Sequence, residues 1–215
     1  EHLCIARPAQ TLVALRAVGR HVDRIALEAP LYVFDQTIYQ GDSTVDFYKY
    51  CLRRRPYIIF RFPLWTALRF VLDSGKKLVF KERFYRFLYA FDDIDSEVSR
   101  FWDGHEKKIK RWYLENRRPD DVVISASPEF LLNPVCKRLG ISVLMASVVD
   151  KKTGLYTGDN CWGKEKVRRF YERFKDGKID DFYSDSYSDS PLARISERAF
   201  IVKGEKIIPW DKTKL

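Results

Sequence analysis

The chain has 215 residues and a net charge of +9, with 46% hydrophobic and 32% charged residues. This composition excludes an intrinsically disordered chain, and the length allows one large domain or a core with an inserted second unit. The positive charge favours an anionic partner, so phosphate esters, nucleic acids and acidic membrane surfaces are all candidates.

The four cysteines, Cys4, Cys51, Cys136 and Cys161, contain no CxxC pair and no interleaved histidines at zinc-finger spacing. We therefore expect neither a disulfide framework nor a structural zinc site. Because no secretory signal pattern is visible, buried reduced thiols in a cytoplasmic protein are the prediction.

Residues 1–30 predict an N-terminal helical extension. Pro30 separates this extension from the strand that follows. It either packs on the body of the protein, acts as a docking or membrane-surface helix, or is foreign to the domain. Apolar residues recur in it at helical spacing, at Leu12, Leu15, Val18, Val22 and Ile25.

The next stretch predicts a buried strand with a polar end. The apolar run 31–34 stops at Asp35, Gln36 and Thr37, and a helix start follows at 41–44. Parallel sheets hold their ligands at the carboxyl ends of strands, so a carboxylate at this place favours chemistry.

A helical block follows at 42–118, with helices expected at 45–52, 57–72, 81–91 and 96–115. The apolar run 57–72 is interrupted by Arg61, Pro63 and Arg69 and is too short to span a membrane. Its aromatic residues and arginines suit either a buried helix or an interfacial one.

The segment 119–215 alternates between strand and helix. Strands are expected at 122–124, 142–146, 181–184, 199–202 and 206–209, helices at 130–139 and 164–174, and a small hairpin at 154–163. Short loops between such elements imply a parallel sheet with right-handed crossovers. We predict a Rossmann-like α/β core from 31–41 and 119–215, with the helical cap at 42–118 inserted after the first strand.

Polar side chains that suit phosphate chemistry follow several of these strands. Mg²⁺ prefers carboxylate oxygens, whereas a phosphoryl group needs hydroxyl and ammonium donors. Each residue also has an ordinary interpretation as a helix cap, a solvated charge or an acidic turn. The residues are Asp35, Thr37, Ser125, Lys166, Asp185 and Asp189.

In order and location, these residues resemble the motifs of the haloacid dehalogenase (HAD) superfamily of phosphatases. The arrangement is similar to the phosphoserine-phosphatase-like branch, subfamily IB, whose cap is inserted between the first two motifs. The resemblance covers about residues 31–210. The matches are Asp35 and Thr37 in motif one, Ser125 in motif two, Lys166 in motif three, and Asp185 with Asp189 in motif four.

The resemblance implies a role for each matched residue. Asp35 is expected to be the general acid and base, while Ser125 and Lys166 hold the phosphate. Mg²⁺ is expected to be bound by Asp185, supported by Asp189, and by the backbone carbonyl of Asp35.

One position departs from this pattern. The family reads Asp-x-Asp-x-Thr in motif one, and Val33 occupies the position of the nucleophilic aspartate. Valine has no lone pair for attack on phosphorus or for binding Mg²⁺, so covalent catalysis should fail. Two functions stay open: Mg²⁺-dependent hydrolysis of a small or lipid phosphomonoester, and non-catalytic binding of a phosphorylated ligand by a pseudophosphatase.

The expected partner is a phosphorylated small molecule or a lipid headgroup, with phosphoserine and phosphatidylglycerol phosphate as examples. The aromatic, arginine-rich cap also suggests peripheral membrane contact by a cytoplasmic protein. Nucleic-acid binding ranks last, because the basic run at 52–56 belongs to no known nucleic-acid module.

Overall fold

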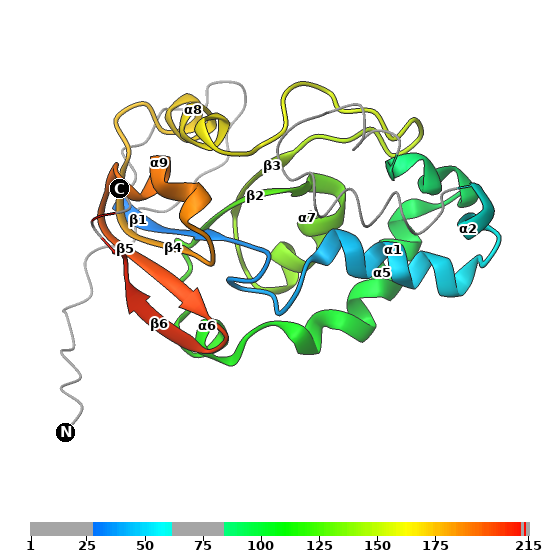
Figure 1. Ribbon diagram of the computed structural model, residues 1–215, viewed down its shortest axis with the longest axis horizontal. Helices are drawn as coiled ribbons and strands as arrows, with labels where there is room; N and C mark the ends of the chain where they lie inside the picture. Colours follow the sequence, from blue (N-terminus) through cyan, green and yellow to red (C-terminus); the bar gives the residue numbers. More distant parts are fainter. Residues whose placement is uncertain (1–27, 62–83, 212, 214–215) are drawn as a thin grey trace.

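A six-stranded sheet forms the centre of the computed structural model, which describes residues 28–61, 84–211 and 213 (Figure 1). The strand order is β3-β2-β1-β4-β5-β6; the first five strands are parallel and β6 is antiparallel to β5. This confirms the predicted Rossmann-like α/β fold. The strands are β1 Glu28–Val33, β2 Val122–Pro128, β3 Val143–Ser147, β4 Lys178–Ser184, β5 Ser196–Lys203 and β6 Lys206–Pro209.

Helices occupy the chain between β1 and β2; most of them extend away from the sheet at one end of the molecule, whereas the last, 111–116, lies beside the sheet near β6 (Figure 1). They lie where the sequence predicts an inserted cap, whose limits as a separate domain stay a prediction. These helices are α1 Ser43–Arg54, α2 Ile58–Arg61, η1 Arg86–Ala90, α5 Ile94–His105, η2 Glu106–Lys108 and α6 Arg111–Asn116. The later helices are α7 Glu129–Arg138, α8 Lys164–Arg173, η3 Tyr187–Asp189 and α9 Ser190–Ala193.

The first strand differs from its predicted limits. It begins at Glu28 and contains Pro30, so the proline does not separate the extension from the strand. Proline has no backbone N–H to donate, and the register between β1 and β4 shifts between Ala29 and Leu31. The predicted helical pattern of residues 1–27 lies outside the described residues.

The helix predicted at 96–115 is broken at Ile109. Ile109 forms an isolated bridge with Tyr39, and the backbone N–H of Lys110 donates to the Ile38 carbonyl at 2.8 Å. These contacts withdraw the backbone from the helix, because a helical residue would donate four residues back along its own chain. The loop after β1 is thereby clamped by the end of the helical insertion.

Two further predicted elements differ in detail. The described part of the helix expected at 81–91 is α-helical at 84–85 and continues as a short 3₁₀ helix, η1. The hairpin expected at 154–163 is a run of turns with one bridge, Val149 to Tyr156. Gly154 has φ +66°, and an added Cβ would lie 2.9 Å from the Tyr85 backbone, so the segment packs against η1 instead of pairing as strands.

Hydrophobic clusters fill both faces of the sheet. One contains Tyr32, Phe34 and the aromatic residues of the insertion, such as Trp102; the other contains Val33, Ile124 and residues of α8. Cys51, Cys136 and Cys161 are buried and free, as predicted for these three. Among the helices that the structure describes, none has the length and apolar character needed to cross a membrane; most of the 57–72 run lies outside them.

Candidate functional site

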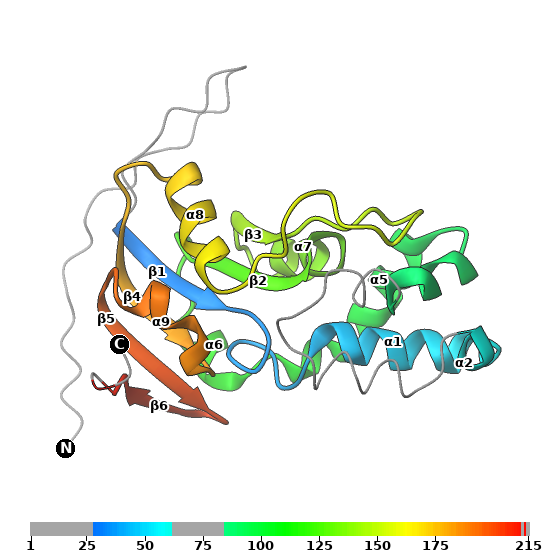
Figure 2. The same ribbon diagram turned by 45° about the horizontal axis from the view of Figure 1, so that its top comes forward.

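The predicted site residues follow neighbouring strands at the same edge of the sheet. β1 lies between β2 and β4, and Figure 2 shows the chain leaving its end toward α1. Asp35 follows β1, Ser125 lies in β2 and Asp185 follows β4. Because these strands are parallel, their carboxyl ends meet, and the fold brings these three residues to one place.

The Asp35 carboxylate accepts two hydrogen bonds. The backbone N–H of Ser43 donates to one oxygen at 2.7 Å, and the hydroxyl of Ser127 donates to the other at 2.6 Å. Burial raises the pKa of Asp35, while the hydrogen bonds from these serines oppose the rise. A carboxyl group with a raised pKa keeps its proton closer to neutral pH, as a general acid requires.

Ser127 belongs to a cluster of hydroxyl groups that the sequence analysis did not assign to the site. Its backbone N–H donates to Ser125 Oγ at 3.1 Å, and Thr44 donates to its hydroxyl at 3.0 Å. The Ser125 oxygen thus serves as an acceptor, which leaves its own O–H to donate to a ligand. The Ser-x-Ser spacing at the end of β2 was the available signal for Ser127.

Asp42 is a second carboxylate that sequence reasoning missed. It caps α1 by accepting a hydrogen bond from the Val45 N–H at 2.9 Å. Burial, followed by the charge of Asp35, raises its pKa to about 7. The Gly-Asp-Ser-Thr helix start was visible in the sequence, but a capping aspartate is usually structural.

Lys166 and Asp189 form a buried ion pair, with 2.6 Å between Nζ and a carboxylate oxygen. The second oxygen of Asp189 accepts the hydroxyl of Ser184 at 2.7 Å. Both oxygens of Asp189 are therefore engaged, an arrangement that holds the Lys166 ammonium group in place. The predicted support of a metal by Asp189 stays a prediction.

Asp185 stands beside this pair. Burial and the nearby Asp189 charge raise its pKa. Lys203 donates from Nζ to its backbone carbonyl at 2.8 Å, which fixes the chain at the end of β4.

The loop that carries Asp35 has an unusual backbone. Gln36 has φ 58°, the left-handed region that residues other than glycine seldom adopt. The buried Lys110 donates from Nζ to the Gln36 carbonyl, and the Gln36 N–H donates to Gly41 at 3.0 Å. Burial lowers the pKa of Lys110. Lys110 was not predicted, because only the fold brings the end of the insertion against this loop.

Val33 and Thr37 complete the first predicted motif. Val33 ends β1, is 7% exposed and packs in the hydrophobic cluster that contains Ile124. Thr37 is fully buried, and its hydroxyl has no hydrogen-bond partner among the described residues. Val33, the residue predicted to occupy the nucleophile position, thus has only hydrocarbon in its side chain.

The donor atoms present do not fit a resident Mg²⁺ ion. The Val33 side chain offers no oxygen, and Asp189 already binds Lys166 and Ser184. Within the described ranges, no group of three or more His, Cys, Asp or Glu side chains could hold a metal ion. Asp185 and a backbone carbonyl of the Asp35 loop supply fewer oxygen ligands than such a site requires.

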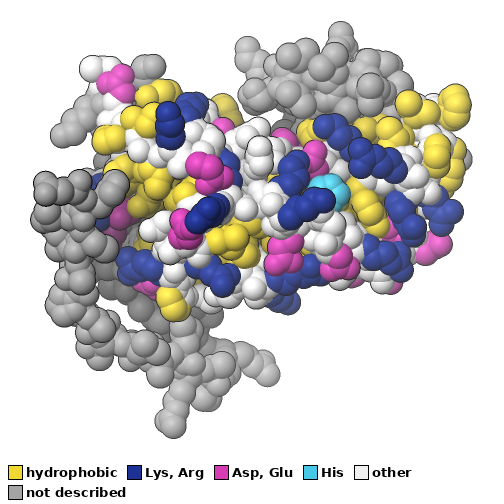
Figure 3. Space-filling view, turned by 90° about the horizontal axis from the view of Figure 1, so that it is seen from below, with side chains coloured by type: hydrophobic (Ala, Val, Ile, Leu, Met, Phe, Trp, Pro, Cys, Tyr) yellow, Lys and Arg dark blue, Asp and Glu magenta, His cyan; other side chains and the backbone are white. Residues whose placement is uncertain are grey.

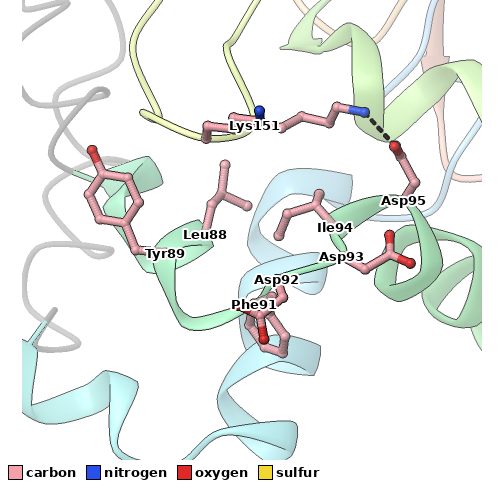
Figure 4. Close-up of a pocket in the computed structure, with 9 residues that line it drawn as sticks. Leu88, Tyr89, Phe91, Asp92, Asp93, Ile94, Asp95 and Lys151 are labelled. Carbon is pink, nitrogen blue, oxygen red and sulfur yellow. Dashed lines mark hydrogen bonds and ion pairs between the residues drawn. The ribbon is translucent and has the colours of Figure 1, made fainter.

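Two cavities lie around Asp95 and Lys151, and neither is lined by a residue of the site. One, of about 420 Å³, lies between the start of α5 and Lys151, whose Nζ is 2.5 Å from Asp95 (Figure 4). The other, of about 540 Å³, shares Asp95 and Lys151 and reaches Phe130 at the start of α7. Neither is lined by Asp35, and the groups that suit phosphate chemistry all lie at the sheet edge where the strands end.

The sequence and the fold match known proteins. Residues 32–194 match the model of the haloacid dehalogenase-like hydrolase family. A Bordetella pertussis protein of unknown function has a similar structure, with a TM-score of 0.68, 19% identity, and coverage of 81% of this chain and 89% of that chain.

A phosphoserine phosphohydrolase-like protein from Francisella tularensis matches with a TM-score of 0.51 and 15% identity, over 80% of this chain and 86% of that chain. A probable phosphoserine phosphatase from Vibrio cholerae matches with a TM-score of 0.54 and 8% identity, over 83% and 58%. No curated protein matches the chain. At these identities the structures support the fold alone, but the family match covers most of the sequence, and the chain belongs to the haloacid dehalogenase-like hydrolase family.

Proposed function

We propose that this chain is a phosphatase-type protein of the phosphoserine-phosphatase-like branch that binds a phosphomonoester without turning it over by the family's covalent route. The observation that carries the proposal is Val33, which is packed in a hydrophobic cluster beside an otherwise polar site. The helices between β1 and β2 are consistent with the branch.

The residues that remain suit a phosphate group. Lys166 supplies an ammonium group held by Asp189, and Ser125 has a hydroxyl free to donate. Such donors stabilise phosphate oxygens strongly at a buried strand edge, where water competes little. We infer that they anchor the phosphate of the ligand.

Asp35 supplies the proton-handling group. Its raised pKa and its hydrogen bond from Ser127 suit protonation of a leaving group. The step before it, attack on phosphorus, requires an electron pair that Val33 does not have. Mg²⁺ would neutralise phosphate charge in an active relative, but the donor set here does not fit it, and no step of this chain is assigned to the metal.

The ligand that we propose is a small phosphorylated metabolite or a lipid phosphate, met in the cytoplasm. The cavities around Asp95 and Lys151, of about 420 and 540 Å³, are within the range of small-molecule sites, but they share no residue with the phosphate site and support no choice of ligand.

The test compares the chain with Val33→Asp and Val33→Asn. Hydrolysis of p-nitrophenyl phosphate is followed with and without Mg²⁺, and phosphoserine binding is followed by calorimetry. We expect the original chain to bind and not to hydrolyse, and Val33→Asp to gain Mg²⁺-dependent activity. Val33→Asn is the matched control, because it adds polarity at the same position without a nucleophilic carboxylate.

Equal hydrolysis by the original chain and Val33→Asp would overturn the assignment of the nucleophile position. Absence of both binding and activity in all three proteins would overturn the phosphate site itself. Since valine at this position already packs well, a thermal unfolding curve for each variant shows whether the added carboxylate has damaged the fold instead.

A further inference from the structure

Four large hydrophobic side chains are exposed around α2 and η1, in the part of the helical insertion that lies far from the sheet. Tyr57 is 47% exposed, Ile59 39%, Phe60 88% and Tyr89 56%. Tyr57 donates its hydroxyl to the Ala90 carbonyl at 3.4 Å, which joins the start of α2 to η1. This contact brings α2 and η1 together at the end of the molecule farthest from β6 (Figure 1), and Tyr89 donates its hydroxyl to the Thr153 carbonyl at 2.9 Å.

The α1–α2 part of this surface is basic, whereas Asp92 and Asp93 follow Tyr89 closely in the chain. The sequence has no acidic residue from Phe47 to Phe60, but it has Lys49 and three consecutive arginines at 53–55. Arg54 pairs with Glu97, whereas Arg53 and Arg55 form no ion pair with a residue in the described part of the chain. Figure 3 shows hydrophobic side chains gathered beside Lys and Arg at this end.

We propose that this basic aromatic tip, formed by Arg53, Arg55, Tyr57, Ile59, Phe60 and Tyr89, docks on an anionic phospholipid bilayer. Exposed aromatic side chains enter the headgroup region, where their rings meet acyl chains and their polar edges meet water. The exposed arginines Arg53 and Arg55 are attracted by the negative surface potential of such a membrane. The charge and the hydrophobicity of the tip are thus both complementary to this one partner.

The geometry separates this contact from the phosphate site. α1 begins at Ser43, which contacts Asp35, and its last residue is Arg54. Twelve helical residues span about 18 Å, so a bilayer at the tip lies roughly that far from the site. Attachment therefore does not require a lipid headgroup to enter the site, and it is independent of Val33.

The experiment uses the full chain and vesicles of phosphatidylcholine, with or without phosphatidylglycerol, in a flotation assay. The wild-type chain is expected to float with the anionic vesicles at low salt and to be released by high salt, because screening weakens electrostatic attachment. Arg53→Gln with Phe60→Ser is expected to lower the partition coefficient at least tenfold, of which the arginine accounts for about fivefold.

The matched control changes one exposed aromatic residue and one exposed arginine on α8, Tyr171→Ser with Arg173→Gln. This control has the same change in charge and should float like wild type, and Phe60→Trp should also retain binding. Failure of the wild-type chain to float, or equal losses in the tip and control variants, overturns the proposal. A tip variant that floats like wild type also overturns the proposal, because another part of the chain must then bind the lipid.

Discussion

The ammonium group of Lys166 lies 2.6 Å from a carboxylate oxygen of Asp189, and the two side chains are each 4% exposed. α8 and η3 are joined by this pair at the edge where the strands end. Two buried charges so close stabilise each other only while both are present, because either alone would remain desolvated without compensation.

Removing one partner of this pair should therefore lower the free energy of unfolding far more than replacing both partners with hydrophobic residues. Asp189→Leu is expected to lower the free energy of unfolding by about 3–5 kcal/mol, and Lys166→Met with Asp189→Leu should recover most of the loss. Urea unfolding measures both. Glu115→Ala removes the exposed ion pair with Arg111 and should cost no more than about 0.5 kcal/mol. A double variant as unstable as the single one would contradict the argument.

Ser127→Ala should remove the hydrogen bond to the Asp35 carboxylate. A hydrogen bond to a charged group contributes about 1.5–3 kcal/mol, so a loss of this size is expected at neutral pH. The loss should shrink in acid, where Asp35 is protonated in both proteins. Unfolding curves over a range of pH test this, with the exposed Ser188→Ala as the control; a loss independent of pH would show that Asp35 is not the partner that matters.

Asp42 should make the protein less stable as the pH rises. Its pKa goes from the usual 3.8 to about 7 on folding, so between these values the unfolded chain holds fewer protons than the folded one. Stability conferred by protonated Asp42 is present below about pH 4 and lost by about pH 7. Asp42→Asn, which keeps a capping oxygen, should gain stability relative to wild type across this window.

A second capping aspartate provides the control for Asp42→Asn. Asp93 caps α5 by accepting the Ser96 N–H at 3.0 Å, and hydrogen bonds from Ser96 lower its pKa. Its contribution has the opposite sign, being present at neutral pH and lost in acid. Asp93→Asn should therefore be less stable than wild type at neutral pH and should approach it as the pH falls.

Gln36→Gly should stabilise the loop that carries Asp35. At φ 58° a side chain costs about 1 kcal/mol that glycine avoids, offset in part by the greater freedom of glycine in the unfolded chain. Gln36→Val should be destabilising, because a branched side chain fits this conformation poorly. Gln40 lies in the same loop and has no positive φ, so Gln40→Gly should destabilise the protein. Thermal unfolding of the three variants tests these expectations.

Val33→Asp should create Mg²⁺ binding that the original chain lacks. Val33 follows Tyr32, the register partner of Tyr183, and Asp185 comes two residues after Tyr183. A carboxylate at 33 would therefore join Asp185 at adjacent strand ends. Calorimetry should show a saturable site only in the variant, and Mg²⁺ at 100 times its Kd should add about 2.7 kcal/mol of stability. Equal binding by both proteins would show that residue 33 is not needed.

The sequence was sufficient for the α/β core because its signals are local. Short apolar runs such as 122–124, followed by amphipathic helices such as 164–174, predict parallel strands with crossovers. The strand ends then place Asp35, Ser125 and Asp185 together, as the structure shows. The prediction of one continuous helix at 96–115 was wrong. Its break at Ile109 depends on a contact with Tyr39, which is far away in the sequence.

What the sequence alone determined is the family, the order of the elements and the valine at position 33, since each is fixed by residue types and spacing along the chain. Only the tertiary structure decided that Ser127 bonds Asp35, that Lys110 clamps Gln36 and that Asp189 is taken up by Lys166. The last two contacts join residues from separate elements. In the sequence these residues look like ordinary helix caps and surface charges. Lys110 meets Gln36 only when the helical insertion folds against the sheet edge, and Lys166 meets Asp189 only when α8 and η3 come together there.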